Sequence, residues 1–145
     1  MSHASAPASS AAGHQSSQKH LDGSLSVGDV VDLVEAAAPP GLAAPWDSNG
    51  LICGDPADPV RSILLAVDPV AAVVDEAINS GVDMIITHHP LYLRGTDHVA
   101  ATDPKGRSIH RLIRAGIALL NAHTSLDAAH GGVAEALAER VGLTC

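Results

Sequence analysis

Two adjacent histidines and a later His–Asp pair are the residues of this chain best suited to chemistry. His88 and His89 follow an apolar run over 82–87, and His123 and Asp127 follow a second apolar run over 117–122. Imidazoles at the end of a buried strand are costly unless their nitrogens are satisfied, and a metal ion satisfies them. Imidazole together with carboxylate suits Zn, Fe, Mn, Co or Ni. The pattern therefore favours a divalent metal site.

The order of these residues indicates how they would share metal ions. Neighbouring side chains of an extended strand point to opposite faces, so His88 and His89 fit two nearby ions, one histidine each. The two oxygens of Asp127 make it a candidate shared ligand. His123 is a further ligand, a residue that orients a ligand, or a proton shuttle. The alternative is that the histidines are hydrogen-bonded loop residues without a metal.

The elements around these residues predict an α/β fold with a parallel sheet. Apolar runs and helical periodicity alternate as strand, helix, strand, helix and strand, over 62–67, 70–80, 82–87, 105–115 and 117–122. Right-handed crossovers make such a βαβαβ unit parallel, with helices on its faces. The carboxyl ends of all three strands then face one edge, where open α/β sheets place their ligands. Asp68, His88, His89, His123 and Asp127 all follow those ends.

Further elements flank this unit. Ser26 is a candidate cap for a helix over 27–38, with Asp29 completing an imperfect capping box, and a last helix is predicted over 132–140. The mixed segment 91–104 is predicted to be a long functional loop. The first strand, 62–67, is apolar at successive positions, which predicts cover on both of its faces.

Composition limits the function classes. The chain has 145 residues, enough for one domain over 25–145, after a Ser- and Ala-rich segment 1–24 that we expect to be a disordered leader. A net charge of -8 gives no basic surface for nucleic acid. Neither a secretory apolar segment nor a membrane-spanning run is present, which favours a cytoplasmic protein.

Three segments resemble the NIF-three-like family, whose members are often catalogued as GTP cyclohydrolase type-two homologues. These are Trp46-Asp47-Ser48-Asn49-Gly50-Leu51, Ile85-Ile86-Thr87-His88-His89-Pro90-Leu91 and Asn121-Ala122-His123-Thr124-Ser125-Leu126-Asp127. The resemblance covers about residues 27 to 145. It implies a dinuclear metal protein with His88, His89 and Asp127 as ligands, assembled as a homo-oligomer, typically a ring-shaped hexamer.

The resemblance extends only to the first half of the family's architecture. Relatives carry a later His and Glu that bind the metals, and nothing after Asp127 matches that segment; Glu135 and Glu139 are expected to face solvent. Ser48 and Asn49 also replace the family's usual Asn and apolar residue. The leading hypothesis is a metal-dependent hydrolase acting on an unidentified small molecule. The alternative is a non-catalytic metal-binding protein or oligomeric scaffold, and the cyclohydrolase name rests on analogy alone.

Overall fold

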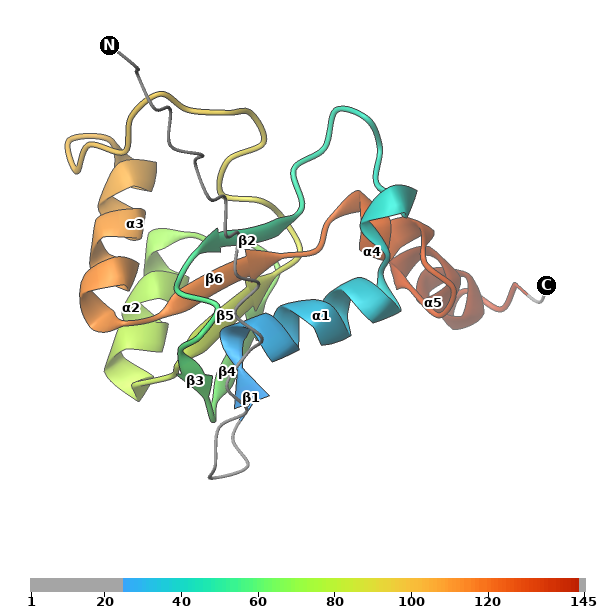
Figure 1. The fold of residues 1–145 in the computed structure, drawn as a ribbon. Coiled ribbons are helices and arrows are strands. Elements are labelled where there is room, and N and C mark those ends of the chain that lie inside the picture. Colours follow the sequence, from blue (N-terminus) through green and yellow to red (C-terminus); the bar gives the residue numbers. More distant parts are fainter. Residues whose placement is uncertain (1–24, 144–145) are drawn as a thin grey trace, which may run out of the picture.

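A computed structural model describes residues 25–143, so the prediction for residues 1–24 lies outside the described part. In chain order the elements are β1 (Leu25–Ser26), α1 (Val27–Ala37), the 3-10 helix η1 (Pro40–Leu42), β2 (Gly50–Cys53), β3 (Pro59–Val60), β4 (Ile63–Ala66), α2 (Ala71–Ser80), β5 (Met84–Thr87), α3 (Pro104–Ala115), β6 (Ala118–Asn121), α4 (Thr124–Ala128) and α5 (Val133–Arg140). The fold is α/β, as predicted, and Figure 1 shows helices on both faces of the main sheet.

The main sheet contains the predicted βαβαβ unit and one strand that was not predicted. Its strand order is β2-β6-β5-β4, in which β4, β5 and β6 are parallel. The additional strand, β2, is antiparallel to β6 and has a register shift between Leu51 and Cys53. Because β2 follows the Trp46–Asn49 segment directly, its pairing brings that segment to the carboxyl end of β6.

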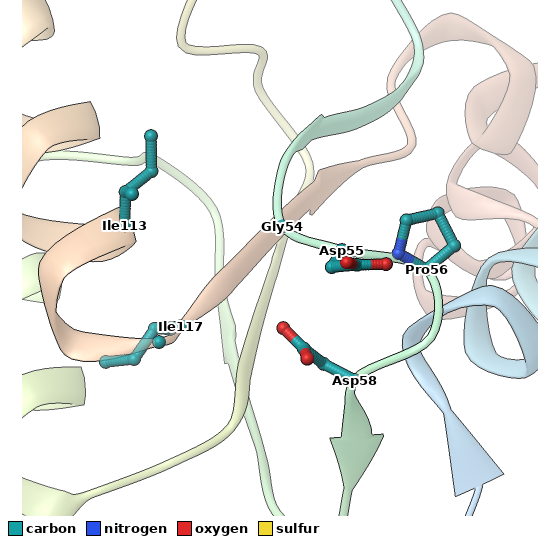
Figure 2. Close-up of a pocket in the computed structure, with 7 residues that line it drawn as sticks. Gly54, Asp55, Pro56, Asp58, Ile113 and Ile117 are labelled. Carbon is teal, nitrogen blue, oxygen red and sulfur yellow. The ribbon is translucent and has the colours of Figure 1, made fainter.

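The amino end of β6 borders a pocket of about 560 Å³ (Figure 2). Asp55 and Asp58, from the loop after β2, line one side, while Ile113 and Ile117, around the turn from α3 to β6, line the other. His123 follows the carboxyl end of the same strand. The pocket therefore lies at the opposite end of β6 from the predicted metal ligands.

Helix ends follow the expected local chemistry. The Ser26 side chain accepts a hydrogen bond from Asp29 N (3.1 Å) and the Asp29 carboxylate accepts one from Ser26 N (2.8 Å), so the capping box is complete. Helices α2 and α3 end at Gly81 and Gly116, whose φ angles of 64° and 67° lie in the left-handed region that glycine adopts without strain. These ends set where β5 and β6 begin.

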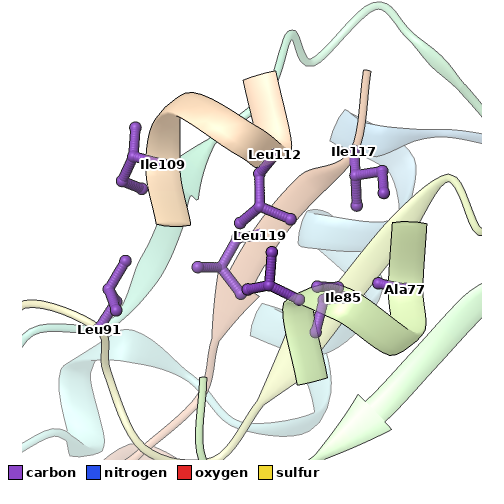
Figure 3. Packing of buried hydrophobic residues seen from close by; sticks show 8 residues of the cluster. Ala77, Ile85, Leu91, Ile109, Leu112, Ile117 and Leu119 are labelled. Carbon is purple, nitrogen blue, oxygen red and sulfur yellow. The ribbon is translucent and has the colours of Figure 1, made fainter. Parts of the chain in front are cut away.

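Two apolar clusters hold the helices against the sheet. Figure 3 shows the larger one, in which residues of α2 and α3 pack on Ile85 and Leu119. On the opposite face, Val27 and Val30 of α1 pack against Met84 and Leu120. Both central strands, β5 and β6, are thus covered on both faces, as near-continuous apolar runs require.

The prediction that strand 62–67 is covered on both faces is wrong. In β4 the side chain of Leu64 packs on the larger cluster, but Ile63 is 41% and Leu65 73% exposed, and Val67 just beyond the strand is 59% exposed. The physical reason is position: β4 is an edge strand, and α1 crosses the other face over β5 and β6. An apolar stripe therefore faces solvent in the described chain.

The segment between Thr87 and Pro104 contains neither helix nor strand, which confirms the predicted long loop. The described residues also include no helix with both the length and the hydrophobicity needed to cross a lipid bilayer. The short helix α4, at Thr124–Ala128, was not predicted. It begins immediately after His123 and carries Asp127.

Candidate metal centre

Three histidines meet at the carboxyl ends of β5 and β6. The ring centroids of His88 and His89 are 5.0 Å apart, and that of His123 lies 5.2 Å from His88 and 5.5 Å from His89. One ring nitrogen from each lies within 4.8 Å of the others, a spacing that could hold a metal ion. The predicted convergence of these strand ends is confirmed for all three imidazoles.

Each imidazole is held through Nδ1 by an oxygen from a neighbouring strand or loop. His88 Nδ1 lies 3.1 Å from the carbonyl oxygen of Ala122, and His89 Nδ1 lies 2.7 Å from Asp68 Oδ1. His123 Nδ1 lies 2.7 Å from Asp47 Oδ1. Because these oxygens accept hydrogen bonds, each Nδ1 is the donor, and each Nε2 is left as the nitrogen available to a ligand.

The predicted ligand Asp127 lies beside the histidine group. Its Oδ1 is 3.5 Å from His88 Nε2, and its side chain is 41% exposed. Helix α4 places it there, because a single turn separates His123 from Asp127 and the Asp127 backbone N–H donates to the His123 carbonyl (3.2 Å). The carboxylate is therefore near one imidazole of the group and accessible from solvent.

Asp47 is the most deeply buried acid at this site. Its side chain is 0% exposed. Burial raises the pKa of the carboxyl, but hydrogen bonds from the Thr124 hydroxyl, His123, and the backbone N–H groups of Thr124 and Ser48 outweigh burial and hold that pKa well below its usual range. Asp47 is therefore a fixed negative charge against His123.

Two asparagines complete the link between the loop before β2 and the end of β6. Asn49 Oδ1 accepts from His123 N (2.6 Å), while Asn49 Nδ2 donates to Asp47 Oδ2 (2.9 Å). Asn121 Nδ2 donates to the Ser48 carbonyl (2.5 Å).

In the sequence, this loop stood out only through its family resemblance. The available signal was a polar Asp-Ser-Asn run preceding an apolar strand, which does not identify its partner more than 70 residues away.

The donor set fits a divalent ion of the predicted kind. Three imidazoles with satisfied Nδ1 atoms and a nearby carboxylate match Zn, Fe, Mn, Co or Ni better than Mg or Ca, which prefer oxygen ligands. Within residues 25–143 the group that could hold an ion consists of imidazoles alone: Cys53 lies within β2 and is not a member, and burial raises the pKa of its thiol to about 11. Glu135 accepts hydrogen bonds from Gly131 N (2.8 Å) and His130 (3.2 Å), and Glu139 is exposed on α5.

Comparisons with known proteins agree on one family. Residues 25–145 match Duf34/NIF3 (NGG1p interacting factor 3). A Mycobacterium tuberculosis protein named GTP cyclohydrolase 1 type 2 homolog is 53% identical over 121 residues, which are 83% of this chain and 31% of that protein. A Streptomyces coelicolor protein of the same name is 48% identical over 115 residues, 79% of this chain and 40% of that protein.

Solved structures give the same result. A Bacillus cereus protein related to NIF3 superposes with a TM-score of 0.77 at 38% identity, covering 83% of this chain and 34% of that one. HcgD from Methanocaldococcus jannaschii superposes with a TM-score of 0.74 at 31% identity, covering 79% and 46%. This chain therefore spans about a third to a half of the length of these relatives.

Proposed function

Because the chain belongs to the Duf34/NIF3 family, we propose that it binds divalent metal ions at His88, His89 and Asp127 and serves as a metal-dependent hydrolase. The observation that carries the metal proposal is the shared anchoring of three imidazoles. In metal sites a ligating histidine donates its second ring N–H to a carboxylate or carbonyl, which fixes its orientation. His88, His89 and His123 all have such a partner.

The chain's own residues define what the site would do. A bound divalent ion lowers the pKa of a coordinated water and polarises a carbonyl, imine or phosphoryl oxygen. His88 and His89 would hold the ions through Nε2, and the half-exposed Asp127 carboxylate, which has two oxygens, would be shared between them. The open side at Asp127 and His89, whose side chains are 41% and 45% exposed, gives a small-molecule substrate its approach.

Metal binding is tested by titrating the purified chain with Zn²⁺, Mn²⁺, Co²⁺, Ni²⁺ and, without oxygen, Fe²⁺. Trp46 is the only tryptophan, and its ring centroid lies 6.2 Å from that of His123, so quenching of its fluorescence by Co²⁺ reports occupation of this site. We expect His88→Ala to abolish quenching and His98→Ala, in the exposed loop, to preserve it. Wild-type protein that retains no metal by elemental analysis and shows no quenching would refute the proposal.

Hydrolysis is separated from metal binding by comparing turnover. A panel of amide, imine and phosphate-ester substrates should be cleaved by the metal-loaded wild type and not by His88→Ala or Asp127→Ala. Metal binding without turnover would favour the alternative, a non-catalytic metal-binding protein or oligomeric scaffold. The homo-oligomer, a ring-shaped hexamer by family resemblance, belongs to the same proposal and is measured by sedimentation velocity of the wild type.

A further inference from the structure

The loop before β2 and the start of α4 are joined through one carboxylate, that of Asp47. Its Oδ1 accepts hydrogen bonds from Ser48 N (2.7 Å) and His123 Nδ1 (2.7 Å). Its Oδ2 accepts hydrogen bonds from Thr124 N (2.9 Å), Asn49 Nδ2 (2.9 Å) and the Thr124 hydroxyl. Five donors therefore converge on a side chain with no solvent exposure, which leaves this carboxylate a single orientation.

His123 is held from two sides by the same loop. Asp47 Oδ1 accepts a hydrogen bond from the ring N–H of His123, and Asn49 Oδ1 accepts one from its backbone N–H, with an N···O distance of 2.6 Å. The ring is 17% exposed, and it forms T-shaped pairs with the rings of His88 and His89, with interplanar angles of 69° and 88°. With Nδ1 engaged by Asp47, the remaining nitrogen, Nε2, is the one offered to the group.

We infer that Asp47 is a positioning residue for the metal centre: it fixes His123 as the Nδ1–H tautomer, so that the lone pair of Nε2 is free to bind a metal ion as a further ligand beside His88 and His89. The two carboxylate anchors differ in exposure. Asp68, which holds His89, is 57% exposed, so water can replace it, whereas the Asp47 side chain is 0% exposed. The consequence for metal affinity rests on the proposed function, but the tautomer belongs to the metal-free chain.

We expect the replacement of Asp47 by Asn to favour the opposite tautomer of His123, with the proton on Nε2. The NH2 group of the new asparagine can take the place of either carboxylate oxygen. In the place of Oδ2 it would meet two other donors, Thr124 N and Asn49 Nδ2. In the place of Oδ1 it meets the His123 ring, which can carry its proton on Nε2 instead, so that Nδ1 accepts a hydrogen bond from the NH2 group. That arrangement leaves fewer opposed donors, so we expect Asp47→Asn to turn the unprotonated nitrogen away from His88 and His89.

The measurement is a long-range ¹H–¹⁵N NMR spectrum of the metal-free, ¹⁵N-labelled chain at pH 8, with the His123 signals assigned by their loss in His123→Gln. We expect a protonated Nδ1 in the wild type and a protonated Nε2 in Asp47→Asn. A protonated Nε2 in the wild type overturns the inference without any variant, so the test does not depend on whether Asp47→Asn folds.

Two matched variants separate positioning from general support of the loop. Thr124→Val removes a hydroxyl from the same network but leaves the Asp47–His123 contact, and Asp68→Asn removes the charge from the other Asp–His pair. Both should keep the wild-type tautomer of His123. If Thr124→Val changes that tautomer as Asp47→Asn does, the role of Asp47 is structural and the inference fails.

Metal affinity gives the second readout. Calorimetric titration with Zn²⁺ should show roughly 10- to 100-fold weaker binding to Asp47→Asn, the usual effect of removing the partner of a ligating histidine. Unchanged Zn²⁺ affinity would overturn the role in the metal centre. Wild-type protein that binds no Zn²⁺ would refute the proposed function instead, while the tautomer measurement would still decide whether Asp47 positions His123.

Discussion

Replacing Leu119 and Leu65 by Ala measures how differently a central strand and an edge strand of the sheet are covered. Leu119 of β6 is 1% exposed within the cluster formed with α2 and α3. A buried Leu→Ala change costs about 2–5 kcal/mol, through lost transfer free energy and the cavity left behind. We expect Leu119→Ala to lower the free energy of unfolding by that amount, a large part of the stability of one small domain.

Leu65 of β4 is the matched control, the same residue type on the same sheet. It is 73% exposed, so only about a quarter of its surface is removed from water. Full burial of a Leu side chain stabilises by about 1.5–3 kcal/mol, so the share at stake in Leu65→Ala is under about 1 kcal/mol. The two changes therefore compare a buried leucine on a central strand with an exposed leucine on an edge strand.

Urea unfolding followed by far-UV circular dichroism gives both free energies. The slope of the free energy against urea concentration should be similar for the wild type and both variants, so that midpoints can be compared directly. Equal costs for Leu65→Ala and Leu119→Ala would refute the assignment of β4 as a solvent-facing edge. A dependence of the Leu65→Ala cost on protein concentration would show that self-association buries this stripe.

Two further predictions concern titratable groups. Hydrogen bonds from Arg61 N (2.8 Å) and Ser62 N (2.9 Å) lower the pKa of Asp83, so its contribution to stability is present above its unfolded pKa of about 4 and is lost as pH falls further. Asp83→Asn should cost about 1 kcal/mol at pH 7 in urea unfolding, and the difference from wild type should shrink below pH 4; a constant difference would contradict this. Burial raises the pKa of Cys53 to about 11, so peptide mapping after iodoacetamide treatment at pH 8 should find Cys53 modified much more slowly than the same residue in urea. Equal rates would show that the thiol is not buried.

The sequence predicts those parts of the fold that depend on local signals. Ser26 and Asp29 form their capping box, and the glycines at 81 and 116 end their helices because few other residues adopt a positive φ without strain. The strands β4, β5 and β6 follow from apolar runs between those helices. Their order and direction follow from the handedness of the crossovers.

Features that depend on distant partners were not predicted. β2 spans only Gly50–Cys53 and has no clear alternation, so its strand structure comes from pairing with β6. The exposure of Leu65 depends on where α1 crosses the sheet, which the residues of β4 do not encode. Asp47 shows the same limit at the site: a buried acid is recognisable only through its donors, and His123 and Thr124 lie more than 70 residues along the chain.

Strand order also determines how the histidine group is built. Each imidazole is oriented by an oxygen supplied from an adjacent strand of the order β2-β6-β5-β4. The segment leading into β2 holds His123 after β6, the residue following β6 holds His88 after β5, and Asp68 after β4 holds His89. Because each partner is carried by its own strand, the three imidazoles take up these orientations only when all three strand pairings have formed. The imidazole orientations therefore depend on the complete sheet. A destabilising substitution in β2 should disturb His123 first and leave the hydrogen bond between His89 and Asp68, which follows β4.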